Sequence, residues 1–116
     1  MLVKFFIDQY RFGSIVINNI EYYADLIITP QKIITDWWRK ESHILLLEDL
    51  QEIDWNNILS VFIGTGTSGL MQVDLLLQEF LEKKNIPFII KPTQIAVKEY
   101  NRLINGMKIG IFHLTC

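Results

Sequence analysis

A glycine-rich run over residues 64–69 is the clearest chemical motif of the chain, because it matches the pattern G-x-G-x-x-G. It follows an apolar segment, residues 58–63, that predicts a strand, and it precedes a segment with helical periodicity. In dinucleotide-binding proteins such glycines permit a tight turn and close backbone approach, and the following helix offers N–H groups to a phosphate. The motif therefore predicts a candidate site for a small anion at Gly64, Thr65, Gly66, Thr67 and Ser68.

The rest of a dinucleotide site is missing around this motif. A ribose-binding carboxylate is expected at the end of the next strand, where the chain has Lys91 followed by Pro92. We therefore favour a bare glycine turn with capping hydroxyls. A site for another small anion and a site for a nicotinamide or flavin nucleotide remain the alternatives, and no cofactor is predicted.

The histidines and acidic residues show no spacing that indicates chemistry. His43 and His113 belong to no metal-ligand motif, so we predict no metal site. His113 precedes the one cysteine, Cys116, by three residues, and alternation along a strand places their side chains on opposite faces. We favour a hydrogen-bonded histidine beside a frayed C-terminus. Turns, caps or solvated faces explain the aspartates, Asp25, Asp36, Asp49 and Asp54.

Two adjacent tryptophans, Trp37 and Trp38, form the candidate interface. In an extended segment neighbouring side chains point to opposite faces, so one indole would face inward and the other outward. An exposed tryptophan indicates a binding surface, because tryptophan is enriched among the residues that dominate interface energies. A bulge or a helix start that buries both indoles remains the alternative.

The first half of the chain predicts short strands. Residues 14–17 and 20–23 flank Asn18 and Asn19, and asparagine tolerates the positive φ of a two-residue hairpin turn. Residues 26–29 and 32–35 predict two further strands around a turn, and residues 47–53 predict a short helix.

The second half alternates strand and helix. After the strand at 58–63, an apolar stripe from Leu70 to Leu81 predicts a helix, and residues 87–90 predict a strand. Thr93 is expected to cap a second helix that closes at Asn105-Gly106, before a last strand at 108–112. The fold class is therefore α/β, a single three-layer domain over residues 1–116. A central mixed sheet flanked by helices would combine an N-terminal hairpin and meander with two βαβ units.

Parallel strands joined by such crossovers end at the same edge of a sheet, which is where open α/β sheets bind ligands. Three strand ends should meet there. Lys91, Thr93 and His113 therefore join the glycine run as candidate ligand-binding residues.

Composition excludes several classes of partner. The chain has 116 residues, 50% of them hydrophobic and 21% charged, and a formal net charge of -2. With no basic field, neither nucleic acid nor a membrane surface is an expected partner. No apolar stretch approaches the ~20 residues of a membrane span, and the start of the chain does not match a secretion signal, so we expect a cytoplasmic protein. The sequence leaves a homo-oligomer open.

The order of several short motifs resembles the Mth-type domain of unknown function. This family includes the adipogenesis-associated Mth domain-containing protein and a mitochondrial respiratory complex I assembly factor. The resemblance covers nearly the whole chain and rests on residues 12–15, Tyr22, Asp25, residues 33–38, His43, residues 63–66, Thr93, Ala96, Tyr100, Asn101 and residues 113–116.

This resemblance implies a three-layer α/β fold with a central mixed sheet and no established catalytic activity. It also implies a bacterial member, because the chain lacks a mitochondrial transit peptide. Two hypotheses for the function follow. The first is a non-catalytic binding or assembly module that docks a protein partner of unknown identity. The second is a protein that binds a small anion at the glycine run, with or without an enzymatic activity of unknown kind.

Overall fold

A computed structural model describes residues 4–116, and its N-terminal part is a small antiparallel sheet of order β1-β2-β3. The strands are β1 (Ile7–Arg11), β2 (Ser14–Ile17) and β3 (Ile20–Tyr22). Asn18 and Asn19 join β2 to β3 with φ of 49° and 66°, which confirms the predicted two-residue turn.

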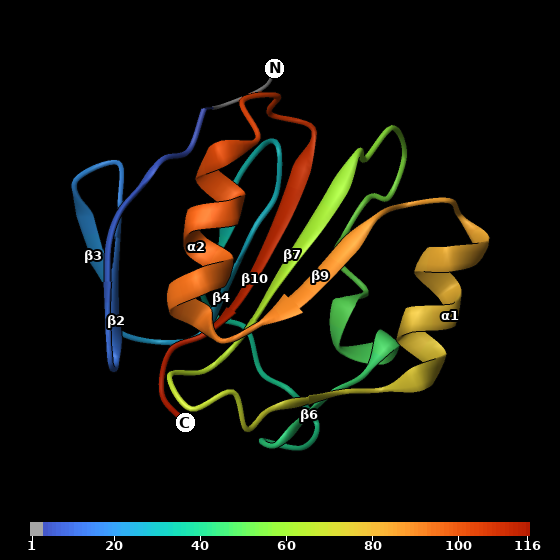
Figure 1. Cartoon of the computed structure of the whole chain (residues 1–116), viewed down its shortest axis with the longest axis horizontal. Coiled ribbons are helices and arrows are strands. Elements are labelled where there is room, and N and C mark those ends of the chain that lie inside the picture. Colours follow the sequence, from blue (N-terminus) through green and yellow to red (C-terminus); the bar gives the residue numbers. More distant parts are fainter. Residues whose placement is uncertain (1–3) are drawn as a thin grey trace.

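A five-stranded mixed sheet of order β5-β4-β10-β7-β9 forms the centre of the molecule (Figure 1). Its strands are β4 (Leu26–Ile28), β5 (Ile33–Ile34), β7 (Ser60–Thr65), β9 (Phe88–Lys91) and β10 (Lys108–His113). β7 runs parallel to both β9 and β10, whereas β4 runs antiparallel to β10. The chain therefore inserts its last strand between a strand from its first half and one from its second half.

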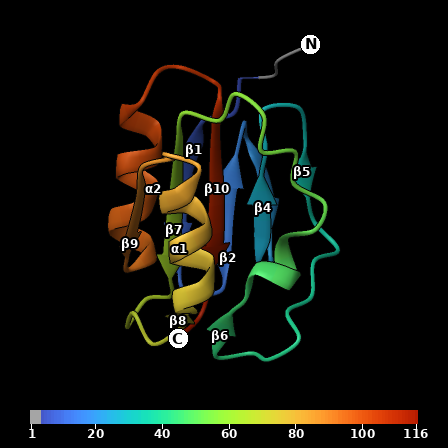
Figure 2. The same ribbon diagram turned by 90° about the vertical axis from the view of Figure 1, so that its right-hand side faces the viewer.

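The two faces of this sheet carry separate apolar cores. Helix α2 (Thr93–Arg102) and the N-terminal sheet cover one face, where Phe62 and Phe112 pack against Tyr100. Helix α1 (Leu75–Lys83) and the 3-10 helix η1 (Leu47–Leu50) cover the other, where Ile63 and Ile111 face inward. Figure 2 shows α1 and α2 at different sides of the central strands. The three-layer α/β fold with two βαβ units is confirmed.

The segment after the glycine run differs from the prediction. A short strand, β8 (Gln72–Val73), pairs in parallel with β6 (Ile44–Leu45), and α1 begins only at Leu75. The predicted helix is confirmed from Leu75 onward, but its predicted start at Leu70 was wrong, because Gln72 and Val73 pair with β6 instead. Pairing with β6 satisfies the backbone here: Gln72 N–H donates to His43 O at 2.8 Å.

Helix α2 also has ends other than those predicted. Pro92 is its N-cap and Thr93 lies inside its first turn, where the hydroxyl bonds elsewhere. The helix ends in extended backbone at Leu103 rather than in a left-handed turn at Asn105-Gly106. The Lys108 ammonium instead donates to the carbonyls of Tyr100 at 2.5 Å and Leu103 at 2.6 Å, so a side chain from β10 caps the helix.

Within residues 4–116, no helix combines the length and the apolar character needed to cross a membrane.

Candidate functional site

The structure brings the predicted ligand-binding residues together at the end of the parallel strands. In the register of the sheet, Gly64 lies opposite both Lys91 and Phe112, and Thr65 lies opposite His113. Thr93 follows β9 at the same edge, and its N–H donates to the Gly66 carbonyl at 3.0 Å. The expected convergence of the three strand ends is therefore confirmed as geometry.

The backbone donors of the glycine run are used inside the protein. Gly66 N–H donates to Thr93 Oγ1 at 2.8 Å, and the Thr93 hydroxyl donates in turn to the His113 carbonyl at 2.6 Å. Thr67 N–H donates to the Thr115 carbonyl at 2.6 Å, and Leu70 N–H donates to the Cys116 carbonyl at 3.1 Å. Because these donors already have acceptors and α1 begins at Leu75, the run lacks the N–H cradle that holds a phosphate in dinucleotide sites.

Packing also explains why glycine occupies two of these positions. Gly66 has φ of +99°, and a Cβ there would overlap the Cys116 carbonyl group. A Cβ at Gly64 would lie 2.8 Å from Thr93 Oγ1. Both positions therefore require a residue without a side chain, which supports the bare glycine turn.

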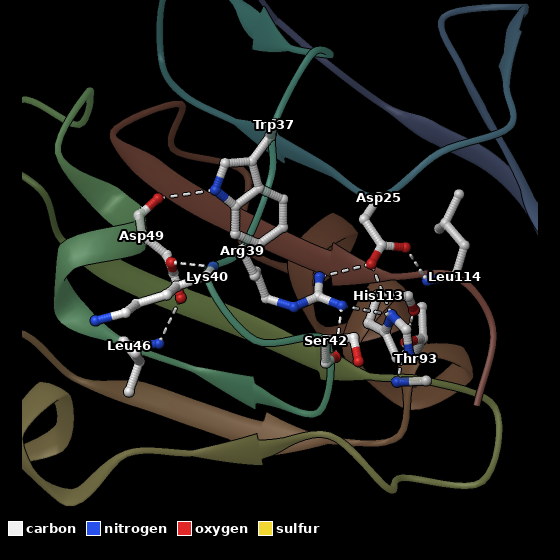
Figure 3. Close-up of polar contacts among 11 residues, drawn as sticks. Asp25, Trp37, Arg39, Lys40, Ser42, Leu46, Asp49, Thr93, His113 and Leu114 are labelled. Carbon is white, nitrogen blue, oxygen red and sulfur yellow. Dashed lines mark hydrogen bonds and ion pairs between the residues drawn. The ribbon is translucent and has the colours of Figure 1, made fainter.

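A buried polar cluster lies beside this edge and includes residues that sequence reasoning did not select (Figure 3). Asp25 directly precedes β4, and the antiparallel pairing of β4 with β10 brings it beside His113. Asp25 Oδ2 lies 2.7 Å from His113 Nδ1, and Asp25 Oδ1 accepts the Leu114 N–H at 2.8 Å. The assignment of Asp25 to a turn or solvated face was wrong, because its carboxylate is largely buried and holds two segments of the chain together.

Arg39 completes this cluster from the loop that follows β5. Its Nη1 lies 2.6 Å from Asp25 Oδ2, and its Nη2 donates to the Ser42 carbonyl at 2.8 Å. The Arg39 side chain is only 8% exposed, and its guanidinium lies 5.4 Å from the centre of the Trp37 ring. Arg39 therefore contacts both Asp25 and Trp37.

Hydrogen bonds decide the charge state of Asp25. Burial opposes its ionisation, but hydrogen bonds from His113, Arg39 and the Leu114 N–H outweigh burial and hold the pKa of Asp25 below its usual value. At neutral pH the carboxylate is ionised, and the short contact assigns the His113 Nδ1 proton to it. The cluster is thus an arginine–aspartate–histidine arrangement with the aspartate as shared acceptor.

The two tryptophans lie on one loop, residues 35–42, which we call the Trp38 loop. Trp37 is half-buried and its Nε1 donates to the Asp49 carbonyl at 2.8 Å, while Trp38 is 87% exposed. The expectation of one indole inward and one outward is confirmed. The Asp49 carboxylate accepts the backbone N–H groups of Lys40 at 2.9 Å and Leu46 at 2.8 Å, so the loop is also fixed from its far side.

Two cavities flank the exposed indole. One, of about 320 Å³, is lined by Asp25, Arg39 and Ser42 among others, and the second, of about 400 Å³, is lined by Glu48 and Glu52 among others. Both are also lined by Asp36, Trp37 and Trp38. Trp38 therefore stands between two hollows on one surface.

The residue pattern of the sequence carried one signal for this site. The Trp37-Trp38 pair indicated the loop directly. Asp25 entered only through the family resemblance and Arg39 carried no signal, because their partner His113 lies 88 and 74 residues away in the chain. In the part of the chain that the structure describes, no group of three or more His, Cys, Asp or Glu side chains could hold a metal ion.

Comparison with known proteins supports the fold and supplies a family. The family model described as a protein of unknown function, DUF498/DUF598, matches residues 7–111. The conserved hypothetical protein PH1505 from Pyrococcus horikoshii OT3 is similar at a TM-score of 0.82 and 26% identity, with 95% of this chain and 98% of that one covered.

Two bacterial structures share the fold at lower identity. A protein described as an outer membrane protein from Bartonella henselae has a TM-score of 0.77 and 20% identity, with 95% of this chain and 94% of that chain covered. A protein from Bordetella parapertussis has a TM-score of 0.62 and 19% identity, with 93% of each chain covered.

Proposed function

We propose that this chain, which belongs to the DUF498/DUF598 family of proteins of unknown function, is a protein-binding module whose partner docks on the Trp38 loop. One observation carries the proposal: the Trp38 indole is 87% exposed on a loop that the rest of the molecule holds in place. Tryptophan is enriched among the residues that dominate interface energies, so an exposed indole that is held in place supports an interface at this loop.

The contacts beneath the loop support binding without rearrangement. Arg39 fixes one side of the loop through Asp25 and Ser42, and Asp49 fixes the other through Trp37 and Lys40. A surface that is ordered before the partner arrives loses little conformational entropy on binding. The Trp38 loop therefore meets the two requirements of an interface anchor, exposure and preorganisation.

Catalysis has weaker support in the described residues. His113 is held by Asp25 as a catalytic histidine would be, but its ring is 11% exposed and lines neither cavity beside Trp38. A general base must reach a substrate proton at hydrogen-bond distance. We therefore assign the Asp25–His113 pair to positioning of the loop and of the end of β10.

Binding of a small anion at residues 64–68 with Lys91, Thr93 and His113 ranks below docking at the Trp38 loop. The strand ends do converge there, but the N–H groups of Gly66 and Thr67 donate to the chain's own oxygens. We also infer that the chain is a bacterial, cytoplasmic Mth-type domain. The order of its motifs supports the Mth-type relationship, and its composition supports the location.

Co-purification with mass spectrometry tests the proposed function. The tagged chain, expressed in its native host, should retain a stoichiometric partner, and Trp38→Ala should lose that partner. Ile104→Ala is the matched control, because Ile104 is 81% exposed and apolar but lies near the end of α2. The partner must then be purified and its binding to each variant measured.

The pattern across the variants decides the outcome. Loss of the partner in Trp38→Ala alone supports the proposal, provided that circular dichroism shows an unchanged fold. Retention of the partner by Trp38→Ala would contradict it, and so would equal loss in both variants.

A further inference from the structure

The surface around Trp38 carries negative charge that the protein itself leaves uncompensated. The exposed carboxylates of Asp36 and Glu52 line the two hollows and form no ion pair within residues 4–116. Glu48 has only a loose contact, 3.8 Å from Lys40 Nζ, between side chains that are both more than half exposed. A partner that docks here must therefore supply positive charge or leave carboxylates without a counter-charge.

The basic groups near Trp38 are too few to make the net charge of this surface positive. The Arg39 side chain is 8% exposed and forms an ion pair with Asp25, so it adds little positive charge to the outer surface. Lys40 is the remaining basic side chain that lines either hollow. An anionic surface such as phosphate-rich nucleic acid or acidic lipid would be repelled at this place.

Aromatic and acidic groups together favour a particular cation. A guanidinium stacks flat on an indole face and donates paired hydrogen bonds to a carboxylate, whereas an ammonium is a compact and strongly hydrated charge. The chain already contains this arrangement on its inner side, where the Arg39 guanidinium lies 5.4 Å from the Trp37 ring centre and bonds Asp25. Trp38 and Asp36 both line the two hollows, so an indole and a carboxylate are also available together on the outer surface.

We infer that the Trp38 loop receives an arginine-bearing basic segment of a partner protein, with a guanidinium stacked on Trp38 and paired with Asp36. This inference rests on the proposed function and specifies the chemistry of the partner. The second hollow, bordered by Glu48 and Glu52, accepts a further basic side chain of the same segment.

The test uses defined peptides as probes of the folded chain. Three glycine-spaced peptides of equal length carry three arginines, three glutamates or three norleucines, and NMR follows the indole N–H signal of Trp38. The arginine peptide should shift this signal in a saturable manner that weakens with added salt, and the other two should leave it unchanged. Equal effects of the arginine and glutamate peptides would overturn the inference.

Variants separate local charge from net charge. The double variant Asp36→Asn/Glu52→Gln should weaken binding of the arginine peptide by about two- to fivefold, as expected for the loss of exposed ion pairs. Trp38→Ala, followed through the backbone N–H signals of its neighbours Asp36 and Arg39, should weaken binding of the arginine peptide by about thirtyfold or more, as expected for an interface anchor. Glu79→Gln with Glu82→Gln makes the same change in net charge on α1 and should have no effect. Equal weakening by both double variants would overturn the inference.

Two further outcomes distinguish this inference from the proposed function. The natural partner could fail to bind Trp38→Ala but bind Asp36→Asn/Glu52→Gln as tightly as the unmodified chain. The proposed function would then stand, and the inference of a basic partner would be wrong. If the natural partner binds Trp38→Ala normally, the proposed function fails. A shift that depends on the concentration of the chain alone would identify a second copy as the occupant and overturn the basic partner.

Discussion

The glycine turn and the Trp38 loop are two irregular segments at one end of the molecule, and they use their polar groups in opposite ways. In the glycine turn, Gly66 and Thr67 give their N–H groups to Thr93 and Thr115, so the turn is closed on itself. In the Trp38 loop, Arg39 and Trp37 bond inward and leave Trp38 outside. A familiar glycine motif thus marks a structural turn, whereas a loop without any ligand-binding motif presents the exposed indole.

The largest expected effect tests the closed character of the glycine turn. Gly66→Ala should destabilise the fold by about 3 kcal/mol, because the new Cβ meets the Cys116 carbonyl and φ is +99°. Gly13→Ala is the matched control, since φ there is +83° but no atom lies within 4 Å of the added Cβ. Its cost should be only about 1 kcal/mol. Similar losses in urea denaturation of the two variants would show that packing around Gly66 is unimportant.

The next effect tests what holds the Trp38 loop. Asp25→Asn removes the charge that pairs with Arg39 and should cost about 2 kcal/mol, because it leaves a guanidinium that is 8% exposed without its counter-charge. Hydrogen exchange should quicken at the Lys40 and Leu46 amides but stay unchanged at Gly66. Faster exchange at Gly66 as well would mean that the two regions unfold together and that the contrast between them is false.

A third prediction concerns the loss of stability in acid, to which Asp25 beneath the Trp38 loop should contribute. Because hydrogen bonds hold the pKa of Asp25 in the folded chain below its usual value, the unfolded chain binds more protons at low pH. This contribution to stability is fully present above the unfolded pKa and is lost as pH falls through the folded pKa. Between pH 5 and about pH 2, the melting temperature should fall less with decreasing pH for Asp25→Asn than for the unmodified chain. If the melting temperatures of the two proteins fell in parallel with pH, Asp25 would not contribute to acid denaturation.

The smallest expected effect concerns Trp38 itself. Trp38→Ala should change the free energy of unfolding by less than about 0.5 kcal/mol, because a side chain that is 87% exposed buries little area. Trp37→Ala should cost about 2 kcal/mol, since its ring covers Arg39 and its Nε1 bonds Asp49. A large loss in Trp38→Ala would show that the indole is part of the core rather than a binding surface.

Local patterns in the sequence were sufficient for most of the elements. Adjacent asparagines predicted the turn between β2 and β3, and apolar runs predicted β7, β9 and β10, because these signals depend on a few neighbouring residues. The helix after the glycine run was misplaced for the converse reason. Residues 70–74 have helical periodicity, but hydrogen bonds from β8 to β6, contributed by a distant segment, hold them extended.

By itself, the sequence determined the layers of the fold, the shared edge where three parallel strands end, and the presence of two adjacent tryptophans. The tertiary structure decided which groups at that edge remain available. It paired the amides of Gly66 and Thr67 with oxygens of the chain itself, joined Asp25 to His113 across 88 residues, and turned Trp38 rather than Trp37 to the solvent. The physical reason is that periodicity and turn propensity act between near neighbours, whereas hydrogen-bond acceptors and burial are supplied by segments that meet only after folding.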